Sequence, residues 1–266
     1  MNQALHQIGR TVARVAGLGA GSVEVRRERL RLRHWPPALA GTRIAVLADL
    51  HTGSPQVDER RLGEIVELVN RERVDVVALL GDYIDPRVAF GEWVSPEAIA
   101  ARLGGLEARA GRYAVLGNHD WAHAGERMPA ALRDAGLPVL ENEAVRTDAG
   151  FWVAGLGDYT KRTADVERAL AQVPLDDPVV LLSHNPDVFP QVPDRVALTI
   201  SGHTHGAQVD IPLVREKTTP SRFGARYAGG HVEEHGRHLY VSEGIGTSRF
   251  PVRFRARPSI GLLDLR

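Results

Sequence analysis

Short apolar runs alternate with amphipathic segments along the first two thirds of the chain. The runs are rich in Val, Leu and Ile and are bounded by polar residues or glycine, which is typical of strands buried in a sheet. The sequence predicts such strands at 43–48, 74–80, 112–116 and 178–182. The segments between them carry apolar residues at helical spacing. The predicted helices are 58–72, 95–104, 126–135 and 163–171.

The rest of the chain is predicted to be mostly β. Residues 23–33 alternate apolar and charged side chains, and two short strands are expected within 138–156 around a turn. Later strands are predicted at 196–200, 206–211, 238–242 and 259–265. This order, βα units followed by strands, favours an α/β fold in which two packed sheets are flanked by helices.

Composition narrows the class of protein. The chain has 266 residues, of which 43% are hydrophobic and 25% charged, and its formal net charge is zero. These are ordinary values for a globular domain. The zero charge gives no support to a nucleic-acid partner, and we do not expect one. No apolar run approaches the roughly 20 residues that a membrane-spanning helix needs, so we expect a cytoplasmic protein.

The first 22 residues are predicted to be an amphipathic leader, separate from a single domain over 23–266. Leu5, Ile8 and Val12 fall on one face of a helix over residues 3–16, and the basic side chains lie elsewhere. A basic amphipathic helix can rest on a membrane surface. Peripheral contact with the inner membrane surface is therefore one interpretation, and packing on the domain or fraying is the one we favour.

Side chains that bind metals follow the predicted strands, at the end where open α/β sheets place their sites. Asp49 and His51 lie two residues apart after the run 43–48, so in an extended strand they would share a face and reach one ion. The other candidates each come just past a later apolar run, and they are Asp82, Asn118, His184, His203 and His205. We expect these side chains to form one binuclear metal site, which indicates a phosphoester hydrolase.

In chain order the blocks read Asp-Leu-His, Gly-Asp, Gly-Asn-His-Asp, Ser-His and Gly-His-Thr-His, from Asp49 to His205. This pattern resembles the calcineurin-like metallophosphoesterase family, and most of all its small bacterial phosphodiesterase-like branch. All five blocks are present with no substituted ligand. The resemblance implies a four-layer α/β/β/α sandwich. One departure is Ala207, where glycine is usual, and it is harmless unless that position needs a positive φ.

The resemblance also implies a role for each side chain. The ligands of a first divalent ion would be Asp49, His51 and His205. Those of a second would be Asn118, His184 and His203. Asp82 would bridge the two ions. By the same analogy His119 is not a ligand but would stabilise or protonate the leaving oxygen, and Asp120 would support it.

Oxygen and imidazole ligands without thiolates suit Mn, Zn or Fe, and the sequence does not choose among them. Two such ions clamp the attacking and leaving oxygens of an in-line displacement and turn a bridging water into hydroxide. We expect cleavage of phosphodiester or pyrophosphate bonds by that hydroxide, with His119 assisting the leaving group. The alternatives are a non-catalytic metal-bound scaffold and a membrane-surface lipid-binding protein.

Two basic stretches lie outside these blocks. The irregular segment 212–230 directly follows the last ligand, and its cations are Arg215, Lys217, Arg222 and Arg226. They are candidates for binding a second phosphate or an anionic lipid head group, and the alternative is a solvated loop. In the second stretch, Arg253, Arg255 and Arg257 alternate with apolar residues, which is typical of a half-buried edge strand.

Overall fold

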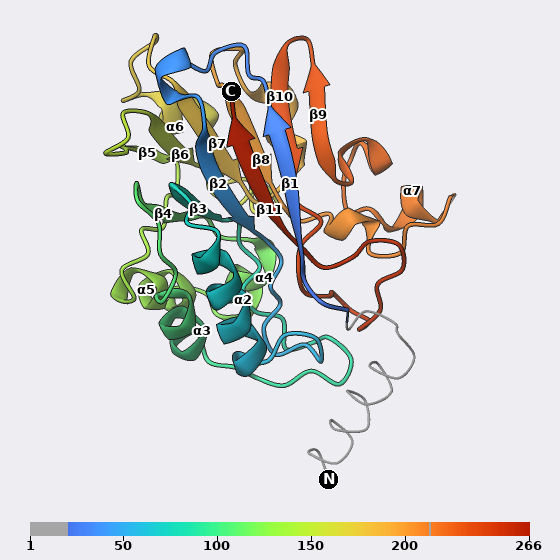
Figure 1. The fold of residues 1–266 in the computed structure, drawn as a ribbon. Coiled ribbons are helices and arrows are strands. Elements are labelled where there is room, and N and C mark those ends of the chain that lie inside the picture. The colour runs from blue at the N-terminus through green and yellow to red at the C-terminus, as the bar shows by residue number, and fades with distance from the viewer. Residues whose placement is uncertain (1–20, 213) are drawn as a thin grey trace.

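Two β-sheets packed face to face form the centre of the molecule (Figure 1). The computed structural model describes residues 21–212 and 214–266. The first sheet has the order β1-β11-β2-β3-β4, and its strands are β1 (Glu24–Leu30), β11 (Ser259–Leu265), β2 (Thr42–Leu47), β3 (Val76–Leu79) and β4 (Arg112–Ala114). The second has the order β5-β6-β7-β8-β10-β9, and its strands are β5 (Glu143–Arg146), β6 (Trp152–Gly155), β7 (Val179–Ser183), β8 (Leu198–Ser201), β10 (Arg237–Val241) and β9 (Gly230–Glu234).

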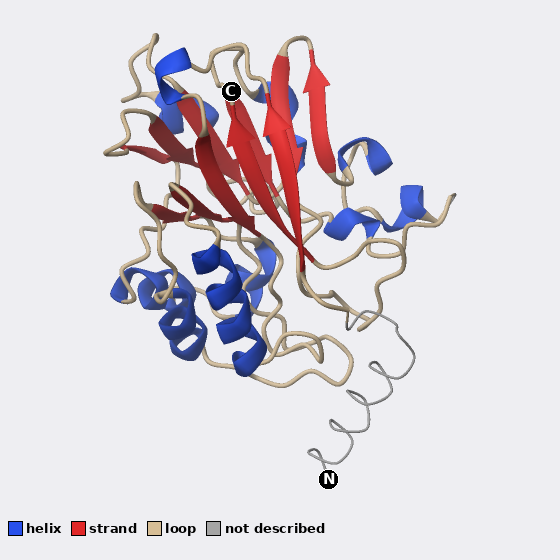
Figure 2. Cartoon of the chain, in the orientation of Figure 1, coloured by secondary structure: helices blue, strands red, loops and turns tan. Residues whose placement is uncertain are grey.

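Helices cover the outer faces of both sheets (Figure 2). Those on the first sheet are α2 (Glu59–Arg71), α3 (Pro96–Leu103) and α5 (Arg127–Asp134). Those on the second are the short α6 (Val166–Leu170) and the 3-10 helix η2 (Pro186–Gln191). The other described helices are α4 (Asn118–His123), α7 (Arg215–Thr218), η1 (Pro37–Leu39), η3 (His205–Ala207) and η4 (Gly224–Tyr227). The predicted α/β/β/α sandwich is therefore confirmed.

Local sequence explains where the helices over the first sheet begin. Asp58 accepts a hydrogen bond from the backbone N of Arg61 at 2.7 Å, and α2 starts directly after it. Ser95 accepts one from Ala98 at 3.2 Å and starts α3 in the same way. Such N-caps satisfy backbone donors that the first turn of a helix leaves free. The apolar stripes that follow each cap pack on the sheet.

Apolar side chains from both sheets meet between them and form the core that holds the sandwich together. Ile44 and Val46 of β2, Val180 and Leu182 of β7, and Leu263 of β11 are each at most 1% exposed. Strands buried on both faces have continuous apolar sequences instead of alternating ones. This is why the apolar runs predicted most of these strands correctly.

The parallel strands bring the functional loops together. β2, β3 and β4 run parallel in the first sheet, and β6, β7 and β8 run parallel in the second. The loops that leave β2, β3, β4, β7 and β8 carry all the candidate ligands. The fold therefore gathers residues far apart in sequence at one edge of the sandwich, as expected for open α/β sheets.

One predicted strand is wrong. Residues 206–211 form part of the 3-10 helix η3 and an irregular stretch, in which Val209 makes isolated bridges to Phe254 and Arg255. The cause is local, because the backbone at 206–208 has positive φ at every residue, and a strand requires negative φ.

The predicted edge strand around Arg253 is also wrong. Arg253 is only 5% exposed, and its guanidinium donates to the backbone carbonyls of Gly246, His205, Glu243 and Ala256. A buried guanidinium needs this many acceptors, since its five N–H groups are taken out of water. Arg253 thus braces the loops beside His205 and does not lie on a solvated edge.

The predicted leader falls mostly outside the described residues, because the structure describes nothing before residue 21. The amphipathic segment 3–16 and its peripheral membrane contact therefore stay predictions. Among the described helices, none has the length and apolar character needed to cross a bilayer.

Candidate metal centre

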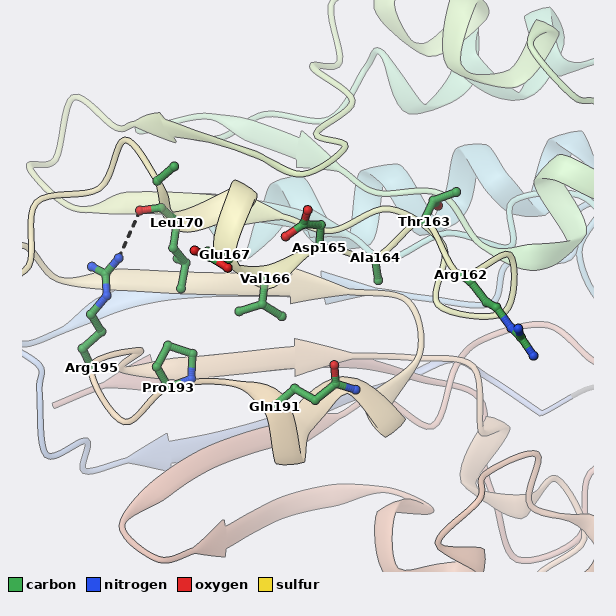
Figure 3. Close-up of a pocket in the computed structure, with 11 residues that line it drawn as sticks. Arg162, Thr163, Ala164, Asp165, Val166, Glu167, Leu170, Gln191, Pro193 and Arg195 are labelled. Carbon is green, nitrogen blue, oxygen red and sulfur yellow. Dashed lines mark hydrogen bonds between the residues drawn. The ribbon is translucent and has the colours of Figure 1, made fainter.

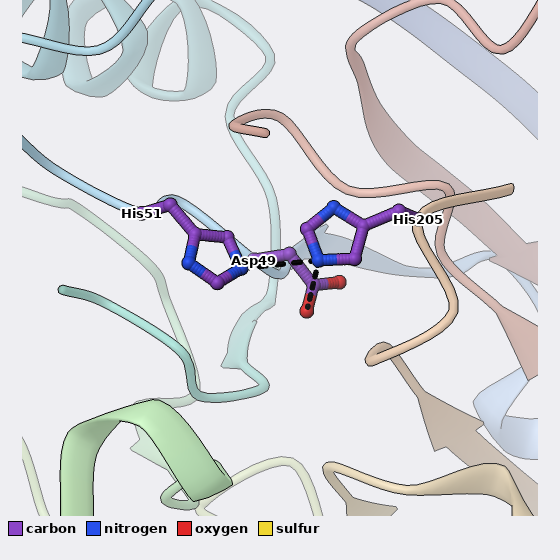
Figure 4. Close-up of side chains that lie close together, drawn as sticks. All are labelled: Asp49, His51 and His205. Atoms are coloured by element: carbon purple, nitrogen blue, oxygen red, sulfur yellow. Dashed lines mark hydrogen bonds and ion pairs between the residues drawn. The ribbon is translucent and has the colours of Figure 1, made fainter. Parts of the chain in front are cut away.

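The loop after β2 supplies the first two candidate ligands. Asp49 and His51 are both fully buried, and they point to the same place (Figure 4). They reach it from a left-handed backbone, with φ of 51° at Asp49 and 43° at His51. The expectation that an extended strand would align them is therefore wrong. The strand ends at Leu47, and a tight turn aligns them instead.

Asp49, His51 and His205 form a first group of potential ligands. The Nε2 atoms of His51 and His205 are 3.0 Å apart, and Nε2 of His205 is 3.7 Å from Oδ1 of Asp49. The potential ligand atoms of the group all lie within 4.8 Å of one another. Two imidazoles and a carboxylate converging in this way suit a divalent transition-metal ion.

Asp82, His184 and His203 form the second group. Nε2 of His184 lies 3.1 Å from Nδ1 of His203 and 3.3 Å from Oδ2 of Asp82. Nδ1 of His184 donates to the carbonyl of Leu80 at 2.7 Å, so Nε2 is the ring nitrogen that faces the group. The same Oδ2 of Asp82 is 3.7 Å from Nε2 of His51. Asp82 therefore lies between the two groups.

Asn118 lies at the start of α4, beside Asp82. Its side-chain Oδ1 is buried and has no hydrogen-bond partner among the described residues. A buried amide oxygen left unpaired is costly, and a cation is one partner that would satisfy it. Together with the two groups it gives an oxygen and imidazole donor set, which fits divalent ions.

Glycines let these loops approach one another closely. A Cβ atom at Gly81 would overlap the backbone of Gly117, and one at Gly117 would overlap the carboxylate of Asp82. One at Gly202 would lie 2.7 Å from the Cβ of Ala48. The loops after β3, β4 and β8 can therefore pack against their neighbours only if these positions lack side chains.

His119 lies at the mouth of the site, with 16% of its side chain exposed. Its Nδ1 is 3.0 Å from Oδ2 of Asp85, and the ring packs edge-on against His51 with centroids 4.8 Å apart. Burial alone would lower the pKa of His119, but the contact with Asp85 and the charge of Asp82 outweigh it and raise that pKa. A protonated imidazole at the mouth is a suitable proton donor.

Burial dominates the protonation of the other histidines. It lowers the pKa of His51 and of His203 to about 3, and it lowers the pKa of His205 as well. These three rings are therefore neutral, the form in which imidazole binds metals. His184 differs, because burial is outweighed by the combined effect of the Asp82 and Asp49 charges and the hydrogen bonds to Asp82 and Leu80, which raise its pKa to about 10.

Comparison with known proteins identifies the family. The sequence model of the calcineurin-like phosphoesterase family matches residues 42–207, which include every candidate ligand described above. The chain belongs to that family. The expected enzyme class, a metallophosphoesterase that hydrolyses phosphoric esters, is thereby confirmed at the level of the family.

Individual relatives of the chain carry related names. The chain is 32% identical over 250 residues to a transmembrane protein with metallophosphoesterase domain from Danio rerio, covering 87% of this chain and 54% of that protein. The chain thus spans about half the length of this curated relative. It is 31% identical over 245 residues to the phosphodiesterase YaeI of Escherichia coli, covering 89% and 87% of the two chains.

The chain is also 29% identical over 239 residues to YkuE of Bacillus subtilis, an uncharacterized metallophosphoesterase. The match covers 87% of this chain and 81% of that one. Among solved structures, a 5′-nucleotidase precursor from Thermus thermophilus superposes with a TM-score of 0.45 at 15% identity, over 76% of this chain and 48% of that one.

Asp120 of this metallophosphoesterase contacts backbone amides of two loops. Its carboxylate accepts hydrogen bonds from the backbone N of Asp82 and Tyr83, each at 2.8 Å, and of Gly117 at 2.9 Å. It therefore fixes the loops after β3 and β4. A role for Asp120 in supporting His119 stays a prediction, since the carboxylate beside the imidazole of His119 is that of Asp85.

Asp85 is the site residue that the sequence motifs missed. It contacts three imidazoles, with its carboxylate oxygens 3.0 Å from Nδ1 of His119, 3.6 Å from Nδ1 of His51 and 3.6 Å from Nε2 of His123. His123, which lies against Asp85, has only 10% of its side chain exposed. The signal was available, because Asp85 follows Asp82 by three residues in Gly-Asp-Tyr-Ile-Asp.

Proposed function

We propose that this metallophosphoesterase holds two divalent ions and cleaves phosphodiester or pyrophosphate bonds. The observation that carries the proposal is the place of Asp82, whose Oδ2 lies 3.3 Å from a histidine of one ligand group and 3.7 Å from a histidine of the other. A shared carboxylate is what a pair of ions needs. The name phosphodiesterase of the Escherichia coli relative supports the choice of bond.

The donor set assigns the ligands. The first ion would be held by Asp49, His51 and His205. The second would be held by Asn118, His184 and His203. Asp82 would serve both. Divalent ions in these places would supply Lewis-acid polarisation of the phosphoryl oxygens and neutralise charge that develops during displacement. Mn, Zn and Fe all suit these ligands.

The remaining chemistry belongs to side chains of the chain itself. His119 would donate a proton to the leaving oxygen, because its imidazole is part-exposed at the mouth and its pKa is raised. Asp85 would hold that imidazole through Nδ1, which leaves Nε2 for the substrate. Asp120 would keep Asp82 in place through the backbone.

Hydrolysis assays with metal-stripped protein test the proposal. We expect bis(p-nitrophenyl) phosphate to be cleaved after addition of Mn, Zn or Fe, and p-nitrophenyl phosphate to be cleaved more slowly. Asp82→Ala should lose both ions, measured by elemental analysis, together with nearly all turnover. His119→Ala should keep both ions and lose a factor of about 10²–10⁴ in kcat.

His34→Ala is the matched control, since His34 is exposed and outside the site, and it should change neither quantity. Full turnover by Asp82→Ala with two bound ions would contradict the assignment. Loss of metal from His119→Ala would make that histidine a ligand. Two bound ions without turnover of any phosphoester would favour the scaffold alternative.

A further inference from the structure

A cavity of about 850 Å³ adjoins the candidate metal centre on the side of His203. Three segments line it. They are the loop after β6 with Tyr159 and Arg162, the turn after β7 with Asn185 and Asp187, and the loop Pro220–Arg222. The volume is in the range of sites that hold small molecules. A substrate whose scissile phosphate lies at the metal centre would place its next group in this cavity.

Hydrogen bonds to Asp187 and Tyr159 hold Arg222 at the wall of the cavity. Buried Asp187 accepts hydrogen bonds from the backbone N of Arg222 at 2.8 Å and from Oγ of Ser221 at 2.5 Å. The guanidinium NH1 of Arg222 donates to the hydroxyl of Tyr159 at 2.9 Å. Asp187 is therefore already occupied by the loop, and the other donors of Arg222 stay available to a ligand.

Arg162 supplies a second guanidinium to the same cavity. Its side chain makes no hydrogen bond or ion pair with any residue that the structure describes. Arg162 also borders a neighbouring groove over α6, and Figure 3 shows its side chain pointing away from Val166 and Leu170 of that groove. Beside it, the Nζ atom of Lys161 lies 4.6 Å from the ring centroid of Trp121. Arg162 and Arg222 therefore both line the cavity, and Lys161 precedes Arg162 in the sequence.

The other predicted cations of the segment 212–230 are not part of this wall. Arg215 pairs with Asp210 at 3.3 Å, and Arg226 pairs with Glu234 at 2.6 Å. Neither they nor Lys217 line the cavity. Among the predicted cations of segment 212–230, only Arg222 lines the cavity, where Arg162 from a different loop joins it. No feature of the sequence gave a reason to connect these two arginines.

We propose that Arg162 and Arg222 form a subsite for a second phosphate of the substrate, next to the phosphate that is cleaved. The inference rests on the proposed function, because it takes the metal centre as the place of the scissile phosphate. Two guanidiniums offer planar, multidentate donors that match phosphate oxygens. The cavity volume of about 850 Å³, with Tyr159 and Pro220 in its lining, would hold a sugar or linker between the two phosphates. The substrate class is therefore a phosphodiester that carries a further phosphate.

A matched pair of esters tests the subsite. The first is thymidine 5′-(p-nitrophenyl phosphate), and the second is the same ester with an added 3′-phosphate, so that the scissile bond and leaving group are identical. We expect the metal-loaded enzyme to prefer the second ester by roughly 10- to 100-fold in kcat/KM, as one or two charge-assisted hydrogen bonds allow. Arg162→Ala/Arg222→Ala should reduce this preference to near unity, mainly through KM.

Arg215→Ala/Arg226→Ala is the matched control, because it removes a half-buried and an exposed arginine that do not line the cavity, and it should keep the full preference. Thermal unfolding of both double variants checks that they are folded. Cleavage of the first ester without preference for the second would overturn the subsite and leave the proposed function standing. An unchanged preference in Arg162→Ala/Arg222→Ala would also overturn it. No cleavage of either ester by the metal-loaded enzyme would contradict the proposed function itself.

Discussion

At the scale of single residues, the metal centre is built on strained backbone. Five of the candidate ligands have positive φ without being glycine, namely Asp49, His51, Asp82, His203 and His205. Each such residue costs about 1–2 kcal/mol, and such residues cluster at functional sites. Ala207 also has a positive φ of 66°, so this departure from the family pattern meets the condition under which it is unfavourable.

Two glycines should respond in opposite ways to the same substitution. Gly63 lies within α2, and a Cβ atom there meets nothing within 4 Å. Gly63→Ala should therefore raise the free energy of unfolding by about 0.5–1 kcal/mol. Gly81 has a φ of 87°, and a Cβ there overlaps the backbone of Gly117, so Gly81→Ala should lose several kcal/mol and the affinity for metal. Urea titration of the metal-free variants measures the free energy of unfolding of each. Equal changes for Gly63→Ala and Gly81→Ala would contradict this account.

The sequence predicted which residues gather at the candidate metal centre better than it predicted the backbone that presents them. Spacing and residue type were sufficient to select Asp49 and His51, because any tight structure after a strand brings neighbours in sequence close together. The left-handed turn depends on contacts with Gly244 and Gly246, which are distant in sequence. Asp85 was missed for a similar reason. Its role exists only because α4 places His119 next to it.

At the scale of elements, Asp120 holds the loops after β3 and β4 together. Asp120→Ala would leave three buried backbone donors without an acceptor, at Asp82, Tyr83 and Gly117. At about 1–3 kcal/mol for each unsatisfied group, we expect a loss of several kcal/mol in the free energy of unfolding, and weaker metal binding. Chemical denaturation and metal titration measure these quantities.

Asp165→Ala is the control, because Asp165 caps α6 with a single hydrogen bond to Arg168 and should cost only about 1 kcal/mol. If Asp120 acted only by supporting His119, its removal would slow turnover and leave stability and metal binding unchanged. That result would contradict the structural role inferred from the three amide contacts.

At the scale of the whole molecule, the two sheets depend on one another. Leu263 of β11 is fully buried between them. Leu263→Ala should lower the free energy of unfolding by about 2–5 kcal/mol, because the cavity lies where both sheets meet. Leu175→Ala is the control, since Leu175 is 77% exposed and should change stability by less than about 0.5 kcal/mol. Similar losses for the two variants, measured by denaturant titration, would contradict a shared core.

The sequence predicted the order of the layers, but it did not predict the order of the strands within each sheet. Apolar runs locate strands, whereas their neighbours depend on contacts between distant segments. The irregular stretch 206–211 shows the limit, since its alternation resembles a strand while positive φ at 206–208 turns the chain. The same limit applies to Arg162 and Arg222, which the fold brings to one cavity from different loops.

The place of β11 has a consequence for how the protein is made. β11 follows every other described strand in the sequence, yet it pairs in parallel with β1 and antiparallel with β2, between these first two strands. While the chain emerges from the ribosome, the edges of β1 and β2 that pair with β11 therefore stay unpaired until β11 has been synthesised. Such edges invite pairing with other chains. We therefore expect the nascent chain to be prone to aggregation until β11 inserts between β1 and β2.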